Sequence, residues 1–190
     1  MSSARRYARA VALVCVGLMA MFGAGGLTPA TPEVLHPSGI TILQVPPAVP
    51  DPLPDDLATA LGRADAMSEQ FPADFGYPLV DRAHGRVILT VTSAQGQSMA
   101  EAVRAGDPAI FEIRSVRHSR ESLQDVLDRA IGPSPEGPMV ISDYPDPASN
   151  RVILEVTEAP DAFLYGLAAR FDPSAIAVLV IGDQPLTYPA

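Results

Sequence analysis

The stretch Asp81-Arg-Ala-His-Gly-Arg-Val-Ile-Leu-Thr-Val-Thr-Ser-Ala94 recurs in a closely similar form later in this chain. Adding 65 to each residue number gives Asp146-Pro-Ala-Ser-Asn-Arg-Val-Ile-Leu-Glu-Val-Thr-Glu-Ala159 without a gap (146 − 81 = 65). The same offset carries Asp107-Pro108 onto Asp172-Pro173. An internal repeat that stays in register over this length predicts two structural units of the same design.

Each copy contains two runs with the pattern of β-strands. Along 87–92 and along 152–157 every second residue is Val or Leu, and the residues between them are Ile, Thr or Glu. A period of two with many β-branched residues is typical of a strand with one face on a core. A shorter apolar run precedes each of them, at 77–80 and at 139–141. The two runs of each copy therefore predict a β-hairpin.

The connection between the runs has the residues that a tight turn needs. It begins with Asp81 or Asp146, whose side chain can bond the backbone two residues on. It ends with Gly85 or Asn150, the two residue types that best tolerate a positive φ. One left-handed turn position explains both identities.

A helix and a third strand follow in each copy. Ser98-Met-Ala-Glu101 has capping-box spacing with Gly106 as the C′ residue, and Asp161 is the expected N-cap in the second copy. The runs 110–116 and 176–181 predict the last strands. We expect an α+β fold of two ββαβ units, with mainly antiparallel sheet packed by helices.

Residues 1–30 have the three regions of a secretory signal peptide. An arginine-rich start precedes an apolar run at 10–22, and cleavage is expected after Gly26 or Ala30. The apolar run is shorter than the ~20 residues that span a bilayer, so we expect no membrane span after cleavage. The Arg5-Arg6 pair leaves the twin-arginine route open, and a retained membrane anchor is an alternative.

The chain has one cysteine, Cys15, within this segment. A lipid-modified cysteine follows a small residue, but Val14 precedes Cys15 and apolar residues continue past it, which favours an ordinary signal. The protein is therefore expected to be secreted or to lie in the cell envelope, without a thiol or a disulfide.

The remaining chain divides into three parts. Residues 31–54 are proline-rich and predict an extended spacer. Residues 55–132 predict a helix capped by Asp55 or Asp56, the first ββαβ unit and a linking helix capped by Ser119, while residues 137–190 hold the second unit. The first helix is expected to pack on the sheet.

The charge of the chain argues against nucleic-acid binding. The sequence has 13 basic and 22 acidic residues, and signal cleavage removes 3 of the basic ones, which leaves a net charge of −12 (13 − 3 − 22). A protein this acidic would be repelled by a phosphate backbone.

No constellation of residues predicts a catalytic, cofactor or metal site. There is no Gly-x-Ser-x-Gly elbow and no glycine-rich phosphate loop. The three histidines are His36 in the spacer, His84 in a hairpin turn and His118 at a strand-to-helix junction. His84 has Ser149 as its repeat counterpart, which suits a turn position. A hydrolase, the alternative class, would use His84 or His118 with Asp81.

Metal ligands and binding side chains have equally ordinary interpretations. Asp81 with His84, and Asp143 with Asp146, lack the multi-ligand spacing of zinc or calcium sites. In the same way Arg86 and Arg151 are expected to form surface ion pairs, with a binding role as the alternative. Tyr144 and Phe75 are expected to close the core.

Four short motifs follow one another in the first copy: Asp81-x-x-x-Gly85-Arg86-Val-Ile-Leu-Thr-Val91-Thr92, Ala102-Val103-Arg104-Ala-Gly106, Val116-Arg117-His118-Ser119 and Leu123-x-x-x-Leu127-Asp128. Together they resemble the prosegment of secreted bacterial serine proteases of the α-lytic protease and streptogrisin type. The resemblance covers residues 79–131, and the second copy matches mainly in its hairpin.

The resemblance implies a function in binding. In that family the segment is an α+β module that assists the folding of its protease and then inhibits it, through an edge strand and a chain terminus placed in the active site. No protease domain follows within this sequence, so we expect a non-catalytic module acting in trans on a secreted serine protease or another envelope protein. A strand edge or the tail Leu186-Thr187-Tyr188 is the expected contact. A small envelope hydrolase and a structural envelope protein are the alternatives.

Overall fold

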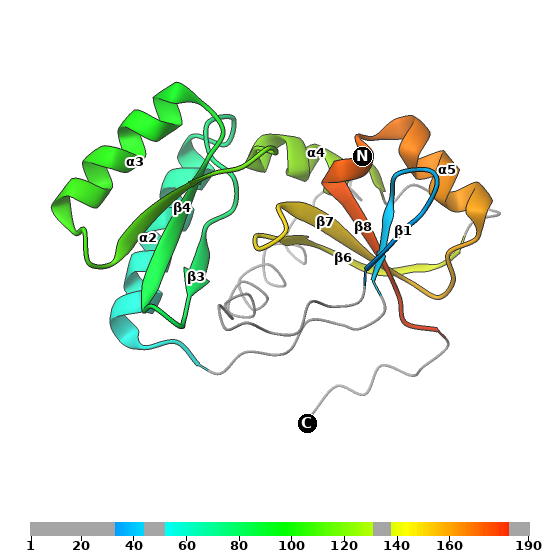
Figure 1. Ribbon diagram of the computed structural model, residues 1–190, viewed down its shortest axis with the longest axis horizontal. Coiled ribbons are helices and arrows are strands. Elements are labelled where there is room, and N and C mark those ends of the chain that lie inside the picture. Colours follow the sequence, from blue (N-terminus) through cyan, green and yellow to red (C-terminus); the bar gives the residue numbers. More distant parts are fainter. Residues whose placement is uncertain (1–32, 44–51, 131–137, 183–190) are drawn as a thin grey trace, which may run out of the picture.

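The computed structural model describes residues 33–43, 52–130 and 138–182. Within them it has an α+β fold of two sheets with helices (Figure 1). The elements are β1 (Glu33–Leu35), β2 (Thr41–Leu43), α2 (Asp55–Gln70), β3 (Leu79–Asp81), β4 (Arg86–Val91), α3 (Ala94–Gly106), β5 (Phe111–Ser115), α4 (Arg120–Ala130), β6 (Val140–Asp146), β7 (Arg151–Val156), α5 (Asp161–Arg170), the 3₁₀ turn η2 (Pro173–Ala175) and β8 (Ile176–Val180).

The smaller sheet has the strand order β3-β4-β5. β3 is antiparallel to β4, and β4 is parallel to β5. Alternate residues of β4 point to one face, where α2 and α3 bury them. The apolar face of α2 that the sequence predicts is confirmed, since Leu57 and Ala64 are buried in this core.

The larger sheet has the strand order β1-β2-β8-β7-β6. β6 is antiparallel to β7, and β7 is parallel to β8. Its main core lies between the sheet and the helices α4 and α5, with Leu154, Leu164 and Val178 wholly buried. Figure 1 shows the two sheets side by side, with α4 between them at the top.

The hairpin turns follow the expected conformation. Gly85 has φ 63° and Asn150 has φ 55°, so both occupy the left-handed region. Asp81 accepts the N–H of His84, and Asp146 accepts the N–H groups of the two residues that precede Asn150. The parallel pairs also agree in register, because Val87 faces Phe111 and, 65 residues on, Val152 faces Ile176.

The expectation of a mainly antiparallel sheet is wrong, because the sheets are mixed. Among the described strands three pairs are antiparallel and three are parallel. In each ββαβ segment the helix carries the chain back across the sheet, so the third strand enters parallel to the second. β2 adds a further parallel pair with β8.

The spacer prediction also fails for part of its length. β1 and β2 lie within it, and β2 pairs with β8. Ile40 and Leu43 are buried. Their short apolar run is flanked by prolines, which is why the composition predicts a spacer. In the structure the run forms a strand because it pairs with the edge of β8.

The predicted helix caps are only partly correct. α3 begins at Ala94, four residues before the predicted capping box, because Ser93 accepts the N–H of Gly96 through its side chain. α2 and α5 begin after prolines, with no capping side-chain hydrogen bond. Ser119 does cap α4, since its hydroxyl accepts the N–H of Ser122.

The linking helix packs with the second unit rather than the first. Leu123, Val126 and Ala130 of α4 are buried in the core of the larger sheet. Tyr77, which precedes β3, joins the same cluster. α4 therefore connects the two units through packing.

Several sequence predictions lie outside the described residues. They concern the signal at 1–30, Cys15, the unplaced part of the spacer and the tail Leu186-Thr187-Tyr188. Among the helices that the structure describes, none is both long enough and apolar enough to cross a bilayer.

Candidate functional site: a pocket between the two units

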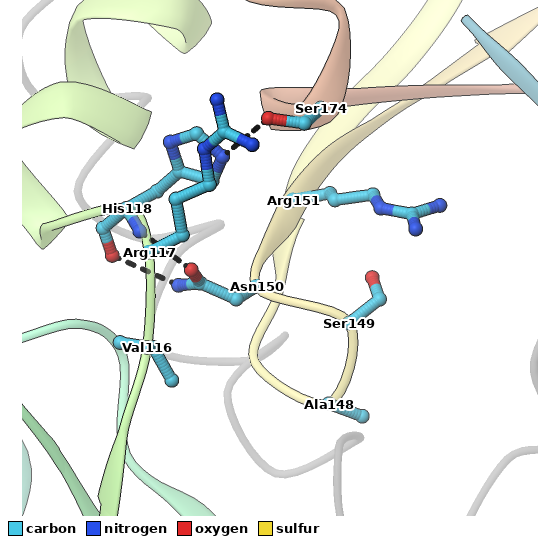
Figure 2. Close-up of a pocket in the computed structure, with 8 residues that line it drawn as sticks. All are labelled: Val116, Arg117, His118, Ala148, Ser149, Asn150, Arg151 and Ser174. Atoms are coloured by element: carbon cyan, nitrogen blue, oxygen red, sulfur yellow. Dashed lines mark hydrogen bonds between the residues drawn. The ribbon is translucent and has the colours of Figure 1, made fainter.

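A pocket of about 340 Å³ lies where the first unit meets the second. The segment after β5 forms one side and the turn of the β6–β7 hairpin forms another (Figure 2). The residues that line it are Val116, Arg117, His118, Ala148, Ser149, Asn150, Arg151 and Ser174.

Asn150 holds the two sides together. Its side-chain Oδ1 accepts the backbone N–H of His118 at 2.7 Å, and its Nδ2 donates to the carbonyl oxygen of His118 at 2.9 Å. At the equivalent turn position of the first unit stands Gly85, which has no side chain. The pocket therefore depends on a difference between the two copies.

His118 and Ser174, which both line the pocket, form a hydrogen-bonded pair. The Nε2 atom of His118 lies 3.0 Å from the hydroxyl of Ser174, and that hydroxyl lies 2.8 Å from Oδ1 of Asp172. An ionised carboxylate only accepts hydrogen bonds, so the Ser174 hydroxyl donates to Asp172. His118 must then donate from Nε2, which fixes the neutral tautomer of its ring.

The ionisation of these groups agrees with this assignment. The hydrogen bonds from the Ser174 side chain and backbone hold the pKa of Asp172 below its usual 3.8. Burial lowers the pKa of His118 from its usual 6.5, against the opposing charge of Asp172. In this arrangement His118 donates to the Ser174 hydroxyl, and the hydroxyl donates to Asp172.

Two arginines line the pocket, and each is paired with a carboxylate that lies outside the lining. Arg117 is 71% exposed and pairs with Asp172 at 3.0 Å. Arg151 is 26% exposed and contacts the Thr41 hydroxyl at 3.1 Å and Glu33 at 3.6 Å. No acidic residue is among the lining residues, although the chain as a whole carries a net charge of −9.

The histidine–aspartate pairing suggested by sequence occurs at one of its two positions. Nδ1 of His84 lies 2.6 Å from Oδ2 of Asp81, on an exposed turn. Burial raises the pKa of Asp81, but the hydrogen bonds and charge of His84 outweigh it and the net shift is downward. His118 contacts Ser174 instead of Asp81.

A second serine–histidine contact, which the sequence did not suggest, occurs at the β1–β2 turn. Nδ1 of His36 lies 2.9 Å from the Ser38 hydroxyl, and Nε2 lies 3.3 Å from Asp161. Nδ1 also accepts the backbone N–H of Ser38. Asp161 is 83% exposed, so water competes for its contact with the ring. The arrangement closes a tight turn.

The remaining candidates have structural roles. Among the described residues no group of three or more histidine, cysteine, aspartate or glutamate side chains is placed to hold a metal ion. Arg86 pairs with Glu112 at 3.6 Å, as expected of a surface ion pair. Phe75 and Tyr144 are buried, in agreement with their predicted place in the core.

The pocket itself was missed from the sequence. The internal repeat predicts only features that both copies share, and the pocket residues differ between the copies. At the offset of 65 residues, Arg117 and His118 align with Gly182 and Asp183 in the sequence. The substitution of asparagine for glycine at position 150 was the available signal. A positive φ explains asparagine as well as glycine, so the pattern gives no sign of what the extra side chain binds.

The edge of the smaller sheet leads to this pocket. The carbonyl oxygen of Ile110 and the N–H of Val116 both bond to β4, at 2.8 and 2.9 Å. Backbone groups in a parallel ladder point alternately to either side, so Ile113 and Ser115 direct their N–H and C=O groups away from β4. None of the hydrogen bonds found within the described chain uses these outward groups.

Comparison with known proteins assigns no class to this chain. No protein-family model matches it, and no curated protein matches it significantly.

Proposed function

We propose that the protein is an exported, non-catalytic binding module that takes up an extended strand of a partner protein along β5. The observation that carries the proposal is the backbone edge at Ile113 and Ser115, whose outward groups have no hydrogen bond within the part of the chain that the structure describes. Addition of a strand to such an edge is a common mode of peptide recognition, because main-chain hydrogen bonds supply affinity. The core behind β5 would hold the edge rigid for a partner.

The other described edges are less suited to strand addition. β6 contains Pro145, which has no N–H, and its register shifts between Val140 and Ser142. Both features are known to protect sheet edges from pairing. β1 and β3 have three residues each. β5 offers five residues without proline.

A secreted serine protease is the partner class that we favour. The support is the resemblance of residues 79–131 to protease prosegments, in which edge-strand pairing also carries the binding. The module would act in trans, as an inhibitor or a folding helper, with Leu186-Thr187-Tyr188 as a further contact. Another envelope protein is the remaining partner class.

A non-catalytic role is supported by the state of the histidines. His118 donates to Ser174, the exposed His84 pairs with Asp81, and the lone pair of His36 Nδ1 is shared between the N–H and the hydroxyl of Ser38. A hydrolase would need one of them to accept the proton of a nucleophile. The geometry therefore favours binding over hydrolysis.

The test is inhibition of a panel of chymotrypsin-fold secreted bacterial serine proteases by the purified protein. We expect sub-micromolar inhibition, or faster recovery of activity when the protease refolds. Ser115→Pro should weaken either effect about tenfold or more, because it removes one outward N–H and obstructs the incoming strand. Ser115 is exposed and its N–H is absent from the ladder to β4, so the fold should tolerate this change.

Ser115→Thr is the matched control. It keeps the N–H, favours the strand and should bind like the native protein. Equal inhibition by both variants would reject β5 as the contact. Absence of any effect across the panel would reject the protease partner and leave a structural envelope role as the alternative.

A further inference from the structure

The pocket lies directly beyond the strand edge at which the partner is proposed to bind. Val116 and Arg117, which line the pocket, are the two residues that follow β5. The chain bends at Arg117 and His118, so Arg117 lies at the carboxyl end of the strand, two residues after Ser115. A strand laid on β5 would therefore bring one of its ends to the pocket.

The charge of the pocket selects which end this is. Arg117 and Arg151 line it, and no acidic residue does. Each guanidinium has five N–H donors, and the contacts to Asp172, Glu33 and Thr41 use a minority of them. A carboxylate would find unused N–H donors on both guanidinium groups, whereas a protonated terminal amine would find no carboxylate among the lining residues. The carboxylates next to the pocket, Asp172, Glu33 and Asp146, are already bonded to Arg117, Arg151 and Ser149.

We propose that the junction pocket binds the C-terminal carboxylate of a peptide strand that pairs in parallel with β5. The direction follows from the geometry: only a parallel strand has its C-terminus at the end of β5 that leads to Arg117. The inference rests on the proposed function, and it adds both the orientation of the partner strand and the chemical group that ends it.

The walls of the pocket suit a chain end. The hairpin turn at Ala148 to Arg151 forms the side opposite the segment that follows β5 (Figure 2). It is fixed there by the two hydrogen bonds of Asn150 to His118. A volume of about 340 Å³ accommodates a terminal residue and its carboxylate. A partner strand that ends in this pocket avoids a clash with the hairpin turn, whereas a longer strand would have to continue past it.

The experiment is an NMR titration of the full chain with one probe peptide in two forms. The peptide is acetyl-Thr-Val-Thr-Val-Thr, either as the free C-terminal acid or as the C-terminal amide. The amide signals of Ile113 and Ser115 report strand addition, and the Nε–H signal of Arg117 reports the pocket. We expect the acid to bind about tenfold more tightly than the amide, since a charge-assisted hydrogen bond is lost in the amide.

Two arginine variants separate the pocket from the strand. Arg117→Gln should remove the preference for the acid while the signals of Ile113 and Ser115 still shift. Arg104→Gln is the matched control, because Arg104 is an exposed arginine of α3 that lies outside β5 and does not line the pocket. It should keep the preference.

The outcomes distinguish the two proposals. If acid and amide shift Ile113 and Ser115 with equal affinity, the carboxylate site is rejected and strand addition stands. If neither peptide shifts those residues, strand addition itself is rejected. A third arm uses acetate alone: if acetate shifts Arg117 while the peptide acid does not, the pocket is a simple anion site and the inference is overturned.

Discussion

Asn150 pairs through its side-chain amide with both backbone groups of His118, at 2.7 and 2.9 Å. The side-chain amide makes the two hydrogen bonds that a peptide group of a neighbouring strand would make, and it thereby joins the second hairpin turn to the segment after β5. Since Asn150 itself has φ 55°, one residue satisfies the turn and fastens the two units. The pocket exists because this contact holds its two sides in place.

Asn150→Gly should therefore loosen the junction without disturbing the turn. Glycine adopts the same φ, but the N–H and C=O of His118 lose their partner, which costs about 1–3 kcal/mol of unfolding free energy if these groups stay buried. Chemical denaturation measures the loss. In the reciprocal control, Gly85→Asn, a side chain enters open space at an equivalent φ, and the change should stay within about 0.5 kcal/mol. Equal effects of the two variants would contradict a fastening role for Asn150.

The lowered pKa of His118 predicts a loss of stability in mild acid. Unfolded His118 takes up a proton near its usual pKa of 6.5, while in the folded protein burial delays that uptake to lower pH. The stabilisation is therefore complete above about pH 7 and declines as the pH falls through 6.5 toward the folded pKa. The shifts of Asp81 and Asp172 act below their usual pKa of 3.8, outside this window.

The measurement compares the unfolding free energy of the native protein with that of His118→Gln between about pH 7.5 and pH 5.5. The native protein should lose stability over this interval more steeply than the variant, since His36 and His84 remain in both. Parallel pH profiles would show that His118 does not resist protonation. Burial and the charges of Arg117 and Arg151 oppose the charged ring, whereas Asp172 and the Ser174 backbone favour it, so the difference between the two profiles reports the sum of these effects.

Local sequence predicted local structure well here, and long-range pairing poorly. Alternation and the Asp-to-Gly or Asp-to-Asn turns led to both hairpins, because those signals act within a few residues. The strand at Thr41–Leu43 was missed because its partner, β8, lies more than 130 residues away. The pocket was missed for a related reason: it needs Asn150, His118 and Ser174 to meet, and no sequence spacing encodes that meeting.

The close approach of α3 to the segment before β3 predicts a strict requirement for glycine at position 96. A Cβ atom there would lie 2.4 Å from the carbonyl oxygen of Asp74, which is backbone and cannot move aside cheaply. Gly96→Ala should therefore destabilise the protein by about 1–3 kcal/mol through overpacking. The matched control is Gly62→Ala in α2, where nothing lies within 4 Å of the new Cβ atom.

The control should be neutral or stabilising by about 0.5–1 kcal/mol, because alanine is the better helix former. Thermal or denaturant unfolding of the two variants checks the contrast. A Gly96→Ala variant as stable as the native protein would mean that α3 can shift away from Asp74, and the packing described for this helix would be wrong.

The hydrogen-bond directions at the two serine–histidine contacts predict that neither serine is an activated nucleophile. The Ser174 hydroxyl gives its proton to Asp172 and receives one from His118, so no lone pair of the ring is directed at it. Nδ1 of His36 accepts the backbone N–H of Ser38 and also faces its hydroxyl, so its one lone pair is shared between the two donors. A fluorophosphonate probe, which reacts with activated serines, should label the native protein no faster than it labels Ser38→Ala or Ser174→Ala.

Labelling that disappears in one of these variants, and that slows when the paired histidine is replaced by alanine, would identify the nucleophile and establish the hydrolase alternative. Labelling equal in all of them would reflect background reaction. The His36→Ala variant should leave protease inhibition unchanged if β5 carries the binding, because His36 lies outside β5 and does not line the pocket. Labelling and inhibition thus respond to different residues, and together they decide between an enzyme and a binding module.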